Sequence, residues 1–130
     1  QAYEEWCRVL KSNGLMLVFD ANWYNYLTDD DSRKDYDADR KKVALSGLDD
    51  YNIGENFDKM EAIAQKLPMT GKLRPEWDKN LLTRYDFSCI EGIENIGEYV
   101  YSEKEKINYG STPLFMIRAV KRGTAGGNKR

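Results

Sequence analysis

Four side chains that could take part in chemistry follow the most apolar run of the chain, residues 15–19. Asp20 and Tyr24 are candidate catalytic residues that could take up a substrate proton, and Asn22 could orient the substrate. Trp23 could stack on a substrate or on a cationic group through its ring face. In open α/β sheets, ligands bind just beyond the carboxyl ends of strands, which is where these residues are predicted to lie. The alternative is structural: Asp20 only caps the next turn, and the two aromatic rings only pack.

Arg74 is a fifth candidate, placed in the loop before a later helix. Its guanidinium could bind an anionic substrate, or it could only pair with an acidic side chain of the segment that precedes it. The chain has no histidine, the usual metal ligand and acid–base residue, and the sequence predicts no metal site.

The elements around residues 15–19 form one α/β unit. Tyr3, Trp6, Cys7 and Leu10 are spaced to share one face of a helix, and Gly14 is suited to the left-handed residue that often ends a helix. Residues 15–19 are continuously apolar, a pattern typical of an interior strand of a parallel sheet that helices cover on both faces.

A polar segment at residues 24–72 is longer than an ordinary connection of about two to six residues, so it is predicted to be a helical insertion. Acidic residues 29–31 suit the start of one helix. Phe57, Met60, Ile63, Ala64 and Leu67 form the apolar stripe of a second helix, which Pro68 ends. The insertion is either a lid over a pocket or an additional packing layer.

The remaining elements are a helix beginning at residues 74–78 and two strands at residues 87–93 and 113–121, the first with a bulge or bend at Gly92. The strands are predicted to pair as a terminal antiparallel hairpin. Residues 98–112 contain tyrosines among charged residues, and they are read as an exposed loop, with a recognition surface as the alternative.

Composition limits the function classes. The net charge is −2, which argues against nucleic acid, and no apolar run reaches the roughly 18 residues of a membrane-spanning helix. Cys7 and Cys89 are predicted to be unpaired core residues, which is typical of a reducing cytoplasm, so a cytoplasmic location is expected.

The segment RVLKSNG at residues 8–14 resembles a motif of the class I S-adenosylmethionine-dependent methyltransferases, in which a helix ends in RVLKPGG and a strand with an acidic end follows. Ser12 and Asn13 replace the usual Pro and Gly. The RPEWD segment at residues 74–78 and the two later strands follow in family order. The resemblance implies that residues 1–122 are the C-terminal portion of a Rossmann-like methyltransferase domain, with a lid-like insertion at about 24–72 and a flexible tail at 123–130.

The resemblance also implies a function: methyl transfer from S-adenosylmethionine to a small-molecule acceptor. The N-terminal half, with its Gly-rich turn and most of the cofactor-binding residues, has no counterpart here; the glycines at 123–127 follow the last strand and precede no helix. This chain would supply the acceptor side, would be inactive alone, and could form a homodimer through an exposed sheet edge. The alternative is a small α/β protein-interaction or ligand-binding module without catalysis.

Overall fold

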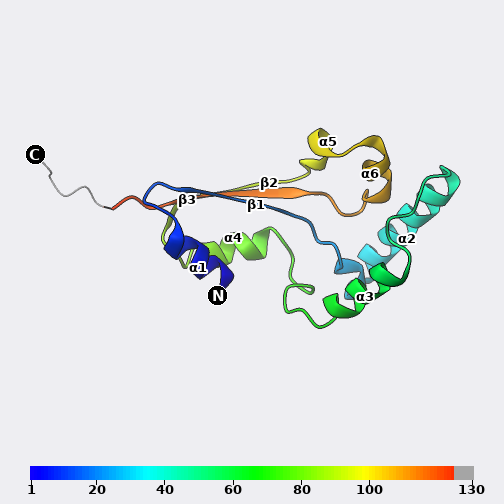
Figure 1. Cartoon of the computed structure of the whole chain (residues 1–130), viewed down its shortest axis with the longest axis horizontal. Coiled ribbons are helices and arrows are strands. Elements are labelled where there is room, and N and C mark those ends of the chain that lie inside the picture. Colours follow the sequence, from blue (N-terminus) through cyan, green and yellow to red (C-terminus); the bar gives the residue numbers. More distant parts are fainter. Residues whose placement is uncertain (125–130) are drawn as a thin grey trace, which may run out of the picture.

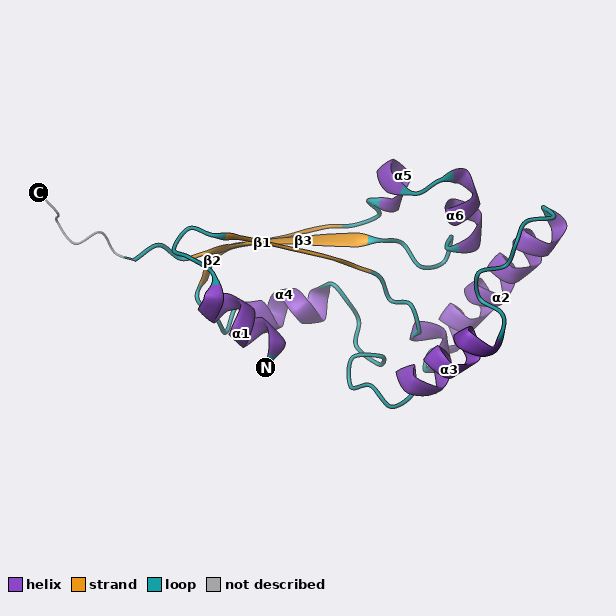
Figure 2. Cartoon of the chain, viewed as in Figure 1, coloured by secondary structure: helices purple, strands orange, loops and turns teal. Residues whose placement is uncertain are grey.

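The computed structural model describes residues 1–124 of the chain; the predicted tail at 123–130 therefore lies mostly outside the described residues. A small sheet carries two helices on one side, and the other helices gather beyond one end of the strands (Figure 1). Figure 2 shows the same division between the sheet and the helical end. The elements in chain order are α1 (Ala2–Val9), β1 (Leu15–Asp20), the 3-10 helix η1 (Asn25–Leu27), α2 (Asp30–Leu45), α3 (Glu55–Ala64), α4 (Glu76–Leu82), β2 (Phe87–Ile93), α5 (Gly97–Val100), α6 (Glu103–Asn108) and β3 (Phe115–Lys121).

The sheet has three strands in the order β1-β3-β2, and both outer strands run antiparallel to β3. The prediction of an α/β protein whose last two strands pair antiparallel is confirmed. The predicted parallel neighbour that would make residues 15–19 an interior strand is not shown: within the described residues β1 lies at the edge of the sheet and pairs only with β3. The central strand is β3, the last strand of the chain. The apolar run of β1 could not predict this, because residue type does not show which strand will pair with it.

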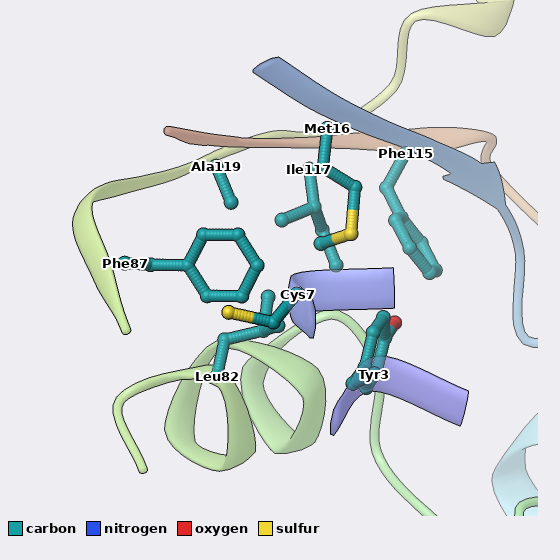
Figure 3. Packing of buried hydrophobic residues seen from close by; sticks show 8 residues of the cluster. All are labelled: Tyr3, Cys7, Met16, Leu82, Phe87, Phe115, Ile117 and Ala119. Carbon is teal, nitrogen blue, oxygen red and sulfur yellow. The ribbon is translucent and has the colours of Figure 1, made fainter. Parts of the chain in front are cut away.

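One face of the sheet forms the core. Alternate residues of β1 and β3 point toward α1 and α4, which both lie below the sheet in Figure 1. Figure 3 shows the resulting cluster, in which side chains of α1 and α4 fill the space beneath the strands. The buried members are Tyr3, Cys7, Met16, Leu82, Phe87, Phe115, Ile117 and Ala119.

Helices were predicted to cover both faces of β1, but within the described residues the face opposite the core is uncovered. Leu15, Leu17 and Phe19 are 48%, 46% and 55% exposed, while Met16 between them is buried. Their partners on β3 are Val120, Arg118 and Met116 in the same order. The continuous apolar run therefore contains both a core face and an exposed apolar face, and a pattern of residue types cannot separate the two.

Three local predictions need correction. The left-handed residue after α1 is Asn13, with φ of 61°; Gly14 is required instead because a Cβ there would lie 2.7 Å from the Lys11 carbonyl oxygen. Trp6 remains 47% exposed, although it shares a helix with the buried Tyr3. The irregularity in β2 falls between Phe87 and Cys89, where the register shifts, and not at Gly92.

Both helices predicted in the insertion are present. Asp29 caps α2 by accepting a hydrogen bond from the Ser32 backbone N–H at 2.8 Å. The next helix, α3, ends at Ala64, a few residues earlier than its apolar stripe indicated. Residues 98–112 are not a plain loop: they hold α6 and most of α5, and Ser102 and Glu105 form a reciprocal capping box at the start of α6.

Candidate functional site

Arg74 stands at the carboxyl end of β1 and joins two acidic side chains. Its guanidinium pairs with Asp20 at the end of β1, and it donates to both oxygens of Asp78 on α4, at 2.9 Å each. The Arg74 side chain is 11% exposed and that of Asp78 is fully buried. The acidic partners of Arg74 therefore come from the end of β1 and from α4, the helix that follows Arg74, and not from the insertion.

Two aromatic residues complete this cluster. The Tyr3 hydroxyl donates to Asp78 at 2.5 Å, and the Arg74 guanidinium lies 5.2 Å from the centre of the Phe115 ring. Burial and the neighbouring Asp78 raise the pKa of Tyr3 well above its ordinary value. Burial alone would lower the pKa of Arg74, but its hydrogen bonds and charge interactions with Asp78 and Asp20 outweigh that effect and raise it. The cluster thus holds a guanidinium cation and a neutral phenol at the end of the sheet.

Asp20 is fully engaged by its surroundings. Its Oδ1 accepts hydrogen bonds from the Ala21 backbone N–H and from the Trp23 Nε1–H, each at 2.8 Å, while its Oδ2 faces Arg74. These contacts fix the turn after β1 and the position of the Trp23 ring. They correspond to the capping role that was the structural alternative for Asp20, and the catalytic role of Asp20 remains a prediction.

Asn22 connects the strand exit to the loop before α4. Its side-chain amide donates to the Arg74 carbonyl oxygen at 2.7 Å and accepts from the Arg74 backbone N–H at 3.1 Å. The donor and the acceptor of one side-chain amide thus bind the carbonyl and the N–H of one backbone residue. Asn22 therefore sets the position of Arg74, in addition to any contact with a ligand.

The five residues singled out from the sequence share one hollow. Asp20, Asn22, Trp23, Tyr24 and Arg74 all line a cavity of about 240 Å³. Its other walls are Leu67, Met69 and Thr70, from the segment that follows α3. The structure thus brings Arg74, which is fifty residues or more away in sequence, beside the four residues that follow β1.

Tyr24 keeps its proton in this setting. Burial, followed by the negative charge of Glu61 and the neighbouring Tyr36, raises the pKa of the Tyr24 phenol. A phenol with a raised pKa remains neutral near pH 7, so Tyr24 is suited to donate a hydrogen bond. A raised pKa makes Tyr24 a poor proton acceptor, the role predicted from the sequence. That predicted catalytic role is not tested by the structure.

A second, larger hollow of about 350 Å³ shares Trp23 and Tyr24 with the first. Its lining was missed by the sequence interpretation: Tyr51 and Asn52 from the loop after α2, Phe57 and Met60 from α3, and Tyr109 from the end of α6. A signal was present, because Tyr109 is one of the tyrosines at 98–112 and the Ser102 capping box marks the helix that carries it.

Asn108 positions this second hollow. Its side chain is buried, and it accepts from the Tyr51 backbone N–H at 3.0 Å while donating to the carbonyl oxygens of Asp49 and Lys104 at 3.1 and 3.2 Å. The Arg40 guanidinium contacts the same residue. One buried amide thus joins the loop after α2 to α6, the two segments that supply Tyr51 and Tyr109.

Within residues 1–124, no group of three or more histidine, cysteine or acidic side chains is arranged to hold a metal ion. Over the same residues, none of the helices has the length and apolar character needed to cross a membrane. Comparisons with protein-family models, curated proteins and solved structures gave no match.

Proposed function

We propose that this chain is the acceptor-side part of a class I S-adenosylmethionine-dependent methyltransferase that acts on a small molecule. The observation that carries the proposal is the hollow of about 240 Å³ lined by Asp20, Asn22, Trp23, Tyr24 and Arg74. It lies at the carboxyl end of β1, the end at which α/β sheets bind ligands, and the insertion supplies its remaining walls. Its residues follow the RVLKSNG segment in the order in which the resembled family places its strand end and lid.

The sheet supports this proposal through its edge. In the described residues β1 has β3 on one side and no strand on the other, and its uncovered face exposes Leu17 and Phe19. An apolar edge strand of this kind pairs readily with a further strand. A cofactor-binding half would supply that strand and cover the exposed face.

The described residues do not by themselves fit the cofactor. No glycine-rich turn leads from a strand into a helix within residues 1–124, so there is no backbone cradle of the kind that holds a nucleotide. The proposal therefore assigns S-adenosylmethionine to another part of the protein. That cofactor supplies an activated methyl group for transfer to a nucleophilic atom of the acceptor.

The residues of this chain bind and orient the acceptor. Asp20 and Asn22 hold Trp23 and Arg74 in place, and Tyr24 offers a hydrogen-bond donor to the hollow. The insertion restricts access of water, which favours a displacement that depends mainly on positioning. For a substrate that must lose a proton, the carboxylate of Asp20 is the candidate acceptor, and it would take up the proton in exchange for one of its contacts with Trp23 or Arg74.

A second candidate function is a ligand-binding module without catalysis. The absence of a nucleotide cradle from the described residues favours this candidate, because either hollow could bind a ligand without a cofactor and without a reaction. The two candidates differ in one property: only the methyltransferase has a partner segment that binds S-adenosylmethionine.

Isothermal titration calorimetry separates them. S-adenosylmethionine and S-adenosylhomocysteine are titrated into this chain and into a version extended upstream by about one hundred residues, the size of a typical domain portion. We expect binding by the extended protein alone, and Trp23→Leu in that protein should leave the affinity unchanged within about twofold because Trp23 lies on the acceptor side. No binding by either protein would exclude the methyltransferase and favour the binding module.

A further inference from the structure

We propose that the hollow of about 350 Å³ between Trp23, Tyr51 and Tyr109 binds the ammonium group of a small molecule. Its use as a substrate site rests on the proposed function, for which it would define the acceptor as an amine-bearing compound. The binding itself does not depend on methyl transfer. Aromatic residues gathered around a cavity are the usual means by which proteins recognise alkylated ammonium groups.

The lining of this hollow is uncharged. Five of its seven residues are aromatic, a sixth is Met60 and the seventh is Asn52. The volume lies within the range of about 300–1,000 Å³ that is common for small-molecule sites. No carboxylate or basic side chain lines it, so an ionic partner would be recognised by the ring faces.

The mutual inclination of the rings favours a rounded group over a flat one. The Trp23 and Tyr109 rings have centroids 5.4 Å apart and are inclined at 77°, and the Tyr51 and Tyr109 rings are 6.0 Å apart at 48°. Two parallel rings would leave a slot for a planar ligand. The Trp23 and Tyr109 rings are in edge-to-face contact, and with Tyr51 they form a concave aromatic wall, called the cage below, which suits a tetrahedral ammonium group.

The tyrosines of the hollow remain protonated. After burial, which is the largest effect, the charge of Glu105 raises the pKa of Tyr109 and that of Glu61 raises the pKa of Tyr24. Arg40 acts in the opposite direction on Tyr109, but the pKa remains above its ordinary value. The phenols therefore stay neutral near pH 7, so that a cationic ligand meets uncharged rings.

The cage is held by polar contacts outside the cavity. Asp20 accepts a hydrogen bond from the Trp23 Nε1–H, and the Asn108 side chain accepts one from the Tyr51 backbone N–H. Tyr109 is the next residue after Asn108, so the same buried side chain also fixes the backbone that carries the Tyr109 ring. Rings fixed in this way lose little freedom on binding, which favours affinity. The Asp20 contact also couples the cage to the hollow that contains Arg74.

The test compares two probes of nearly equal shape by isothermal titration calorimetry. Choline carries a quaternary ammonium, and 3,3-dimethylbutan-1-ol replaces its nitrogen by carbon and has no charge. We expect choline to bind this chain and the neutral probe to bind at least about tenfold more weakly, because only the cation is attracted to the ring faces. Equal affinity for the two probes, or no binding of choline, would overturn the inference.

Variants of Tyr109 test the role of the ring. Tyr109→Leu should weaken choline binding at least about tenfold, whereas Tyr109→Phe keeps the ring face and should change it by no more than about twofold. Tyr99→Leu is the matched control, because Tyr99 is 90% exposed and does not line the hollow. If Tyr109→Phe loses as much affinity as Tyr109→Leu, the hydroxyl and not the ring binds the ligand, and the cage is refuted.

Folding and function are controlled separately. Each variant is compared with the unchanged chain by far-ultraviolet circular dichroism, and Tyr51→Leu replaces Tyr109→Leu if the latter does not fold, with the same expected loss. Choline binding by a protein whose extended form fails to bind S-adenosylmethionine would retain the ammonium site while refuting the methyltransferase. The reverse result would refute only the ammonium site.

Discussion

Replacing Arg74 by methionine removes the cation that pairs with Asp20 at the end of β1 and with Asp78 on α4. Arg74 pairs with Asp20 and with the fully buried Asp78, and its own side chain is only 11% exposed. Methionine keeps much of the volume of the arginine stem but loses the contact of the guanidinium with the Phe115 ring. The Arg74→Met change therefore leaves Asp78 buried with the Tyr3 hydroxyl as its remaining side-chain partner.

The size of the effect follows from that buried charge. Breaking a buried ion pair by removing one partner costs about 3–5 kcal/mol, since the other charge is left uncompensated. Unfolding entropy of about 2.1 cal/mol/K per residue gives about 0.27 kcal/mol/K for a chain of 130 residues. The expected fall in Tm is therefore about 11–18 °C.

Urea unfolding and thermal unfolding of Arg74→Met measure this loss. Arg8→Met is the control, because Arg8 forms an exposed pair with Glu5 and its removal should not change stability measurably. The double variant with Asp78→Asn should recover much of the loss, because the buried charge is then removed as well. A single variant that loses less than about 1 kcal/mol would show that the Arg74 cluster is not a buried ionic contact.

Three further predictions concern other parts of the chain. Asn108→Ala should lower the free energy of unfolding by about 2–4 kcal/mol, because it leaves the Tyr51 N–H and two carbonyl groups without partners; urea unfolding measures this, with the exposed Asn80→Ala as control, and equal losses would contradict it. Phe19→Lys, a charge on the exposed edge strand, should reduce any self-association seen by sedimentation velocity, and an unchanged dimer would show that this edge is not the contact. Burial and the hydrogen bond to Glu61 raise the pKa of Tyr26 above its ordinary value of about 10. The folded state therefore holds the Tyr26 proton more tightly than the unfolded state does. The resulting contribution to the free energy of unfolding is present below about pH 10 and is lost as the pH rises further. Tyr26→Phe should accordingly reduce the loss of stability between pH 8 and pH 11, and an identical loss would contradict the assignment.

Local features of the fold could be predicted from the sequence because they depend on residues close together in the chain. The helix at Ala2–Val9, the strand at Leu15–Asp20 and the two insertion helices follow from apolar spacing and from capping residues such as Asp29. The strand at Phe87–Ile93 was predicted with its observed bounds. The short helices α5 and α6 were missed, and the neighbours of each element also lay beyond such reasoning.

The candidate site was predictable in part for the same reason. Asp20, Asn22, Trp23 and Tyr24 are adjacent in sequence, so any strand at residues 15–19 places them together at its end. The position of Arg74 beside them, and the pairing of its guanidinium with Asp20, required the path of the whole insertion. The aromatic hollow was missed because Tyr51 and Tyr109 are far apart in sequence and are brought together by the fold, in which the buried side chain of Asn108 binds the Tyr51 backbone.

The sequence by itself determined the three strands, the longer helices and the polar residues that follow β1, because spacing and capping act over a few residues; the short helices α5 and α6 were not among them. Tertiary structure alone decided that β3 lies between β1 and β2, that one face of β1 is buried and the other exposed, and that Arg74 joins Asp20 and Asp78. The physical reason is that strand pairing and charge pairing are settled by contacts between residues far apart in the chain. Residue type shows that such a partner is needed, and only the folded chain shows which residue it is.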